Sequence, residues 1–326
     1  MRRERTVREV DSESRRFAAG INWYPGHMKK TREMMQENLK LVDAVIEVID
    51  ARIPVSSRNP VIDEITKGKT RVVVLNKIDL ADASQTELWK KSFLSQGMRT
   101  AAVNCSSGAG VKELMQILRA LQEEKDSRTI RKRPLRLMIA GVPNVGKSSL
   151  INKLTGKKGA RTGDRPGVTK GKQWLALVSG MQLLDTPGIL WPKFEDPNVG
   201  LNLAFCGAIR DEILDVETLC LELIKVLLKD YEQLLKVRYK LEEISSDGLE
   251  AMEQIARRRG FLFSGNRIDY ERTARTVLDE FRAGKIGRIT LERCGDSGKD
   301  TAEQRAAEPA GEGGKAAEHE KGSEER

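Results

Sequence analysis

The stretch GVPNVGKS at residues 141–148 places two glycines, a lysine and a serine at a spacing that suits phosphate binding. Glycines let backbone N–H groups wrap around phosphate oxygens, Lys147 reaches those oxygens with a positive charge, and the Ser148 hydroxyl is suited to ligate Mg²⁺. The apolar run before it and the helix-compatible stretch after it supply the strand–loop–helix context that this motif requires. The expected phosphate-binding residues are Asn144, Val145, Gly146, Lys147, Ser148 and Ser149.

The tetrapeptide NKID at residues 76–79 follows the apolar run RVVVL and indicates which base the nucleotide carries. The Asp79 carboxylate can accept hydrogen bonds from guanine N1–H and the 2-amino group together, a pairing that adenine cannot offer. Asn76 can hydrogen-bond the base edge, and the aliphatic stem of Lys77 can cover the ring. Such a tetrapeptide alone could be a turn, but beside the phosphate motif it favours GTP over ATP. The residues expected to bind GTP or GDP here are Asn76, Lys77, Ile78 and Asp79.

A third polar segment, Asn104-Cys105-Ser106, follows the next apolar run. Guanine-nucleotide-binding proteins often carry Ser-Ala at this place, with a backbone N–H that meets guanine O6. Cys105 departs from that pattern, but a backbone contact does not depend on the side chain. We therefore expect Asn104, Cys105 and Ser106 to complete the base site.

The tetrapeptide DTPG at residues 185–188 can sense the γ-phosphate. Asp185 would hold Mg²⁺ through a water molecule, and the Gly188 N–H would face the γ-phosphate during hydrolysis. Thr169 in RPGVTKG is the natural magnesium ligand of the preceding segment; Thr162 is the competing candidate, and the PGVT context favours Thr169. The next residue, Ile189, stands where a glutamine usually orients the attacking water, so another residue must position that water.

Short β-branched runs lie immediately before these motifs and predict the strands that position them. The expected strands are 44–50, 71–76, 100–104, 135–141, 174–178 and 181–185. Helical spacing between some of them, as at 110–122, predicts an α/β fold of three layers with a mostly parallel sheet. The charged stretch 122–134 is expected to be a linker between two halves of this domain.

The order of the motifs is permuted relative to an ordinary GTPase, which runs from the phosphate loop to DxxG and then to NKxD. Here NKID and NCSS precede the phosphate loop, Thr169 and DTPG. Because each motif still ends a strand, the same sheet can form from a circularly permuted chain in which 122–134 joins the former ends. The expected fold is therefore a circularly permuted P-loop GTPase domain followed directly by a small all-α domain.

Four segments are expected along the chain: a basic N-terminal extension (1–20), the permuted domain (21–195), a helical domain (200–294) and a disordered acidic tail (295–326). The helical domain is predicted from three apolar faces. Their residues are Leu219, Leu223, Val226 and Leu227; Leu249, Met252 and Ile255; and Ala274, Val277, Leu278 and Phe281. The tail has no apolar residue larger than alanine, and such a segment cannot bury enough surface to fold.

Composition favours a polyanionic partner. The chain has 57 Lys and Arg against 48 Asp and Glu, and the acidic tail leaves a strongly basic body. Such an excess suits nucleic acid, although a charged surface is often only solvated. Four dispersed cysteines indicate neither a zinc site nor a disulfide framework, and no signal peptide or apolar membrane span is evident. We expect a cytoplasmic protein without a membrane partner.

The motif order, together with the amino-terminal WYPGHM and the helical carboxy-terminal region, resembles the ribosome biogenesis GTPase A family over residues 21–290. This resemblance implies a magnesium-dependent GTPase that binds the precursor of the large ribosomal subunit, with its helical domain on ribosomal RNA rather than DNA. It also implies a hydrophobic residue in place of the catalytic glutamine, as at Ile189. Asn144 matches the asparagine that supports a potassium ion in related GTPases.

His27 is the candidate to replace the missing glutamine. The other histidine, His319, lies in the tail. Imidazole can orient water, accept its proton or stabilise developing phosphate charge. Alternatively, His27 only caps a helix that Trp23, Tyr24 and Met28 pack onto the domain, or its loop contacts RNA. The resemblance to a family in which this histidine is implicated in hydrolysis makes the catalytic interpretation as strong as the structural one.

The leading interpretation is a GTP-driven switch in large-subunit assembly, stimulated by the ribosomal particle and released after hydrolysis. One alternative is an RNA-binding chaperone module with a mainly structural nucleotide site, which the intact Lys147, Ser148, Thr169 and Asp185 argue against. Another is a P-loop nucleoside kinase, in which NKID and DTPG would lack a role. RNA phosphates are expected to meet the basic residues Arg257, Arg258, Arg259 and the segment 282–288.

Overall fold

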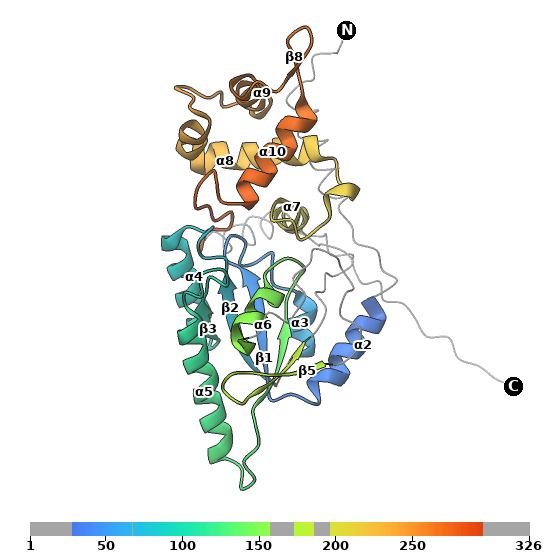
Figure 1. The fold of residues 1–326 in the computed structure, drawn as a ribbon, viewed down its shortest axis with the longest axis vertical. Helices are drawn as coiled ribbons and strands as arrows, with labels where there is room; N and C mark the ends of the chain where they lie inside the picture. The colour runs from blue at the N-terminus through green and yellow to red at the C-terminus, as the bar shows by residue number, and fades with distance from the viewer. Residues whose placement is uncertain (1–27, 67, 157–172, 186–195, 296–326) are drawn as a thin grey trace, which may run out of the picture.

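The computed structural model describes residues 28–66, 68–156, 173–185 and 196–295, with an α/β domain below and a helical domain above in Figure 1. The helical domain lies over the edge of the sheet at which the parallel strands end (Figure 1). The N-terminal extension and the acidic tail lie outside the described residues.

A six-stranded sheet forms the centre of the α/β domain, with strand order β3-β2-β1-β4-β6-β5. The strands are β1 (Ala44–Asp50), β2 (Thr70–Asn76), β3 (Arg99–Ala102), β4 (Arg136–Ala140), β5 (Gln173–Ala176) and β6 (Gln182–Asp185). All neighbours pair in parallel except β5, which pairs antiparallel with β6 at the edge. All six expected strands are confirmed, and the fold is that of a circularly permuted GTPase domain.

Alternate residues of the central strand β1 point to opposite faces of the sheet, as the two-residue period of a strand requires. Ile46 and Val48 pack against α5 (Val111–Ser127) and α6 (Lys147–Thr155). Val45 faces α2 (Met28–Leu39) and α3 (Pro60–Ile65), and Ile49 faces α4 (Ala83–Ser95). Burial on both faces explains why β1 is apolar along nearly its whole length.

The linker expected at 122–134 is wrong in its first half. Residues 122–127 form the last turns of α5, and the connection to β4 begins only at Arg128. Polar side chains there make defined contacts: Gln122 donates to Asp126 at 2.9 Å within the helix, and Lys125 pairs with Asp43, just before β1, at 2.9 Å. High charge therefore marked a polar face of the helix rather than a break in it.

The helical domain is built from α7 (Pro197–Phe205), the 3₁₀ helix η2 (Asp211–Ile213), α8 (Val216–Tyr239), α9 (Gly248–Arg259) and α10 (Tyr270–Arg282). A two-stranded hairpin, β7 (Leu262–Phe263) with β8 (Arg267–Ile268), connects α9 to α10. Helix α8 packs against both α9 and α10. Aspartates cap four of these helices at their N-termini, as is typical of residues that accept from the free N–H groups there.

One of the three expected apolar faces of this domain, that of α10, is confirmed in full, and the other two are partly wrong. On α8, Leu219, Leu223 and Leu227 are buried, but Val226 is only half-buried. Leu249 is 46% exposed, whereas Met252 and Ile255 are buried. The buried stripe of α9 includes Gly248 and Ala251, so it is offset by one residue from Leu249. One apolar cluster continues from the α5–α6 face of the sheet through α7 into this domain, so the two domains share a core.

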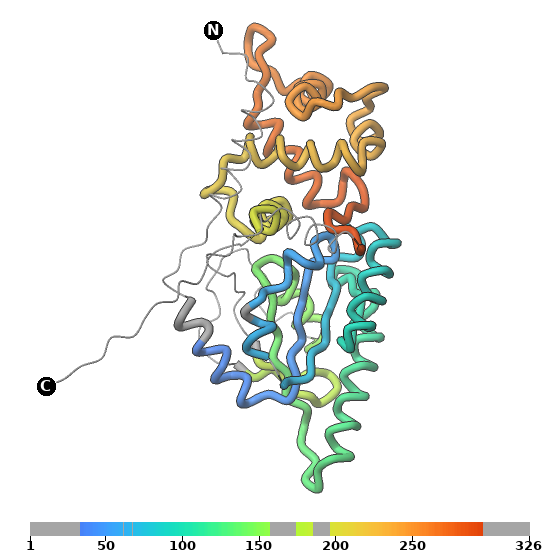
Figure 2. Tube along the Cα trace, turned by 180° about the vertical axis from the view of Figure 1, so that it is seen from behind, coloured from blue at the N-terminus to red at the C-terminus, as the bar shows by residue number. Residues whose placement is uncertain are grey.

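The last described residues return to the α/β domain (Figure 2). In this C-terminal segment, residues 285–294, Ile289 N–H donates to Leu80 O at 2.9 Å and Leu291 N–H donates to Arg52 O at 2.8 Å. Trp89 Nε1–H donates to Glu292 O at 2.8 Å. The helical domain is therefore attached to the α/β domain at both ends of its chain.

Candidate nucleotide-binding site

The carboxyl ends of parallel strands bring four loops together at one edge of the sheet. These are the loop after β1, the base loop after β2 (residues 76–82), the loop after β3 (residues 104–108) and the phosphate loop between β4 and α6 (residues 141–146). Asp50 and Asn76 are register partners at the ends of β1 and β2. The expected phosphate and base motifs therefore lie side by side.

The phosphate loop requires glycine at two positions. Gly141 has φ of +153°, and a Cβ there would lie 2.3 Å from the carbonyl oxygen of Val48. Gly146 has φ of +97°, and a Cβ there would lie 2.1 Å from Nδ2 of Asn76. Both the backbone conformation and the space around it thus exclude a side chain.

Lys147 is the first residue of α6, and its side chain is buried within the phosphate loop. Its Nζ donates to the carbonyl oxygens of Gly141 at 3.0 Å and Val142 at 2.6 Å. Ser148 and Ser149 follow in the first turn of α6, both half-buried. A helix N-terminus with free N–H groups and a neighbouring ammonium suits a phosphate chain.

Asn76 connects the three loops and is only 2% exposed. Its Nδ2 donates to Val145 O in the phosphate loop at 2.7 Å, and its Oδ1 accepts from Cys105 N–H at 3.2 Å. Asn76 thus forms a bridge within the protein, and its contact with the base edge stays a prediction. This bridge fixes the phosphate loop relative to the base loop.

The next three residues of the base loop differ in their contacts within the protein. Lys77 has φ of +63° and places its Nζ 2.9 Å from Oδ2 of Asp50. Ile78 N–H donates to Val103 O at 3.4 Å. Asp79 is exposed, and no described residue hydrogen-bonds to its carboxylate. Its oxygens are thus available to a base in the way that the sequence predicts.

The loop after β3 is held by its own side chain. Asn104 Oδ1 accepts from Ser106 N–H at 2.8 Å and from Ser107 N–H at 3.1 Å. Cys105 is buried, and burial raises the pKa of its thiol to about 12. Since Cys105 N–H already donates to Asn76, the expected contact with guanine O6 requires this hydrogen bond to be shared or broken.

The helical domain contacts both halves of the site. Asn144, exposed and with φ of +59°, donates from Nδ2 to Gly207 O at 2.7 Å, just after α7. Arg288 donates to Ile78 O at 2.7 Å and to Ala81 O at 3.0 Å in the base loop. The structure therefore joins the phosphate loop to the start of the helical domain and the base loop to its end.

Other expected site residues lie outside the described part of the chain: His27, Thr169, Gly188 and the neighbouring Ile189. Asp185 ends β6, but its side chain is not described. Among the described residues, no group of three His, Cys, Asp or Glu side chains could hold a metal ion.

Sequence reasoning missed Asp50, the last residue of β1, and Arg52 in the loop after it. Both are 1% exposed, and they pair at 2.8 Å. An available signal was the sequence DAR at the end of a buried strand, because oppositely charged residues in such a place are seldom buried unless they pair.

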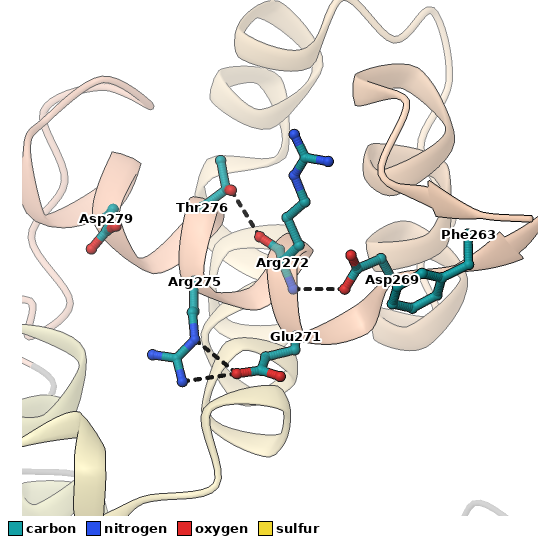
Figure 3. A pocket seen from close by; sticks show the side chains of 7 residues that line it. All are labelled: Phe263, Asp269, Glu271, Arg272, Arg275, Thr276 and Asp279. Carbon is teal, nitrogen blue, oxygen red and sulfur yellow. Dashed lines mark hydrogen bonds and ion pairs between the residues drawn. The ribbon is translucent and has the colours of Figure 1, made fainter.

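A hollow of about 380 Å³ lies on the helical domain, between the hairpin and α10 (Figure 3). Two of its charged side chains form an ion pair, Arg275 with Glu271 at 2.9 Å, and Asp269 accepts from the backbone N–H of Arg272 at 3.0 Å (Figure 3). The hollow has charges of both signs and contains none of the expected nucleotide-binding residues.

A family model described as "50S ribosome-binding GTPase" matches residues 136–252. The match begins at β4, so it includes the phosphate loop and omits the base loop, which comes earlier in this permuted chain. Ribosome biogenesis GTPase A of Bacillus cereus is 49% identical over 276 residues, which make up 83% of this chain and 93% of that relative. The chain belongs to the ribosome biogenesis GTPase A family.

Other members agree with this assignment. Ribosome biogenesis GTPase A of Thermotoga maritima is 33% identical over 276 residues, covering 85% of this chain and 95% of the relative. The crystal structure of GNP-bound YlqF from T. maritima matches with a TM-score of 0.57 and 29% identity, covering 82% of this chain and 99% of that chain. As a member of the family, the chain is a GTPase that binds guanine nucleotides and hydrolyses GTP. None of the described helices is long and apolar enough to cross a membrane.

Proposed function

We propose that this GTPase acts in assembly of the large ribosomal subunit, where it binds the precursor particle through ribosomal RNA and leaves after GTP hydrolysis. Family membership supports a role in ribosome assembly. The observation that carries the switch is the pair of contacts from the helical domain to the nucleotide loops, Asn144 to Gly207 and Arg288 to Ile78. A domain held at both loops can change position when the nucleotide changes.

Guanine nucleotide binds across the phosphate and base loops in this proposal. Lys147, Ser148, Ser149 and the N–H groups at 144–146 hold the phosphates, and Asp79 holds the base. Lys147 must exchange its hydrogen bonds with Gly141 and Val142 for phosphate oxygens. The burial of Lys147 favours that exchange, because an ammonium in a partly dehydrated loop interacts strongly with an anion.

Mg²⁺ fits this donor set, since hydroxyl and carboxylate oxygens are the ligands it prefers. Ser148 and Thr169 would bind it directly and Asp185 through water; bound there, the ion neutralises charge that develops on the phosphate oxygens. Asn144 can serve a potassium ion with Oδ1, because Nδ2 is the atom that binds Gly207.

His27 is proposed to position the attacking water in place of the side chain that Ile189 cannot supply, and the Gly188 N–H to face the γ-phosphate. Helix α2 begins at Met28, directly after the histidine. It runs antiparallel to β1, so its N-terminal end lies at the same edge of the sheet as the nucleotide loops (Figure 1).

Contacts within the protein reduce the set of basic residues that we propose as RNA contacts. Three of those expected from the sequence bind protein groups instead: Arg259 binds Glu280, Arg282 binds Asp211 at 2.6 Å, and Arg288 binds the base loop. Arg258 and Lys285 are exposed, and their side chains have no hydrogen-bonding or ionic partner among the described residues. We propose these two as phosphate contacts, together with Arg257, which lies 3.9 Å from Glu253.

Single-turnover GTP hydrolysis with and without large-subunit precursor particles tests the proposal. We expect the particles to accelerate hydrolysis. The His27→Ala variant should lose at least about tenfold of the stimulated rate, since a positioned acid or base contributes roughly 10²–10⁴-fold, while GTP affinity stays the same. His319→Ala is the matched control. Absence of stimulation by the particle would contradict the assembly role, and an unchanged His27→Ala rate would contradict the role of the histidine alone.

RNA binding is tested with the double variant Arg258→Gln/Lys285→Gln. Each lost phosphate contact should reduce the slope of log affinity against log salt by about 0.7–0.9. The control is Arg131→Gln/Lys132→Gln, two exposed bases on the connection between α5 and β4. Equal salt slopes for both double variants would contradict the assignment of these RNA contacts.

A further inference from the structure

Asp50 is a buried carboxylate at the end of β1 that belongs to none of the nucleotide motifs. Its Oδ1 accepts from the backbone N–H and the Nε of Arg52, both at 3.0 Å. Its Oδ2 accepts from Nη2 of Arg52 at 2.8 Å and from Nζ of Lys77 at 2.9 Å. Asp50 thus binds the lysine of the base loop through a charge-assisted hydrogen bond, one of the stronger types in proteins.

The fold itself brings Asp50 to this lysine. Parallel pairing of β1 with β2 makes Asp50 the register partner of Asn76, the residue before Lys77. Lys77 adopts φ of +63°, a left-handed value that is unfavourable for a residue with a side chain. A contact that fixes the ammonium of Lys77 helps to maintain this conformation and the direction of the aliphatic stem.

The charges around Asp50 keep it ionised. Burial alone would raise the pKa of its carboxyl, but the positive charges of Arg52 and Lys77 and their hydrogen bonds hold it well below its usual range. Arg52 is 1% exposed, whereas the Lys77 side chain is 21% exposed. Of the two cations, Lys77 is thus the one that a ligand can reach.

Arg52 fixes the other side of Asp50. Its guanidinium lies 5.2 Å from the centre of the Phe281 ring in α10, and its carbonyl oxygen accepts from Leu291 N–H at 2.8 Å. Asp50 is therefore held from the helical domain through Arg52. Because the carboxylate is fixed, moving the Lys77 ammonium would break its hydrogen bond with Asp50.

We propose that Asp50 is a positioning residue for guanine binding, which holds the Lys77 ammonium so that the aliphatic stem of this lysine lies against the base. The inference rests on the proposed assignment of the base loop to guanine. It adds a residue outside the recognised motifs that determines affinity without touching the nucleotide.

GDP affinity of the full chain, measured by calorimetry, tests the proposal in a double-mutant cycle of Asp50→Asn with Lys77→Met. The asparagine side chain of the Asp50→Asn variant is uncharged, and its NH2 group would face donors of Arg52 or Lys77 instead of accepting from them, so it holds the Lys77 ammonium less strongly. Methionine keeps an aliphatic stem but lacks the ammonium that Asp50 holds. We expect each single variant to bind GDP at least about tenfold more weakly, and the double variant to bind no more weakly than Lys77→Met.

Asp43→Asn is the matched control. Asp43 directly precedes β1 at its other end and pairs with Lys125 at 2.9 Å and Arg133 at 2.8 Å. This variant should lose stability and keep its GDP affinity. If Asp50 had only a structural role, Asp50→Asn would instead weaken GDP binding by the same factor in the unaltered chain and in the Lys77→Met background, which would overturn the inference.

One further variant, Asp79→Asn, compared with Lys77→Met, separates this inference from the assignment on which it rests. If Asp79→Asn and Lys77→Met both bind GDP like the unaltered chain, the base loop does not bind guanine and the proposed assignment fails. If Asp79→Asn weakens GDP binding but Lys77→Met does not, only the role of Asp50 is contradicted. The Lys77→Met variant leaves the Asp50–Arg52 pair intact, so it decides the outcome even if Asp50→Asn does not fold.

Discussion

Replacing Asn76 with alanine should break the connection between the phosphate and base loops. The substitution removes hydrogen bonds of 2.7 Å to Val145 O and 3.2 Å from Cys105 N–H, at a site that is 2% exposed. A buried group left without its partner costs about 1–3 kcal/mol. Two such groups give a loss of roughly 2–6 kcal/mol in the free energy of unfolding. For a chain of this size that loss lowers the melting temperature by about 3–9 °C.

The assay is thermal unfolding with and without GDP, together with GDP affinity at about 25 °C. We expect Asn76→Ala to weaken GDP binding as well, since Val145 no longer holds the phosphate loop in place. Gln96→Ala is the control, because this exposed amide donates only to Ser92 within its own helix region. A variant at position 76 that melts and binds GDP like the control would refute the reasoning.

Three further outcomes are expected. Gly146→Ala should lose GDP affinity by more than about tenfold in calorimetry, because its Cβ would displace the amide of Asn76 and φ of +97° disfavours alanine. Burial raises the pKa of Glu292 above its ordinary 4.5, so the folded protein loses stability as pH rises above 4.5 and the buried carboxyl must ionise. In urea titrations, Glu292→Gln should therefore gain stability relative to the unaltered chain as pH rises. Iodoacetamide at about pH 8 should modify Cys294 first by mass spectrometry, because the other three cysteines are buried and burial raises the pKa of Cys206 to about 12.

The sequence predicted the sheet and the loops well because their signals are local. An apolar run such as AVIEVID has only a few ways to bury its side chains, and the glycines of the phosphate loop stand next to the strand and helix that they connect. The order of the motifs along these strands was sufficient to predict a permuted sheet.

The contacts made by individual polar side chains could not be predicted in the same way. A contact of Asn76 with the base was expected, but its hydrogen bond to Val145 O, 69 residues away in the chain, was not. Arg259 and Arg282 looked like part of a basic RNA surface, but each has an acidic partner on another helix. Such partners depend on how α8, α9 and α10 pack, which residue spacing does not encode.

The return of the C-terminal segment to the base loop has a consequence for how the protein is made. Arg288 donates to carbonyl groups that lie 207 and 210 residues earlier in the chain. During synthesis the base loop therefore emerges long before the residues that hold it, and β1 and β2 can pair without Arg288, Ile289 and Leu291. Contacts of such wide sequence separation form late because the intervening chain must first be ordered. We therefore expect a growing chain to acquire its sheet early and its complete guanine site only when the whole helical domain has been translated.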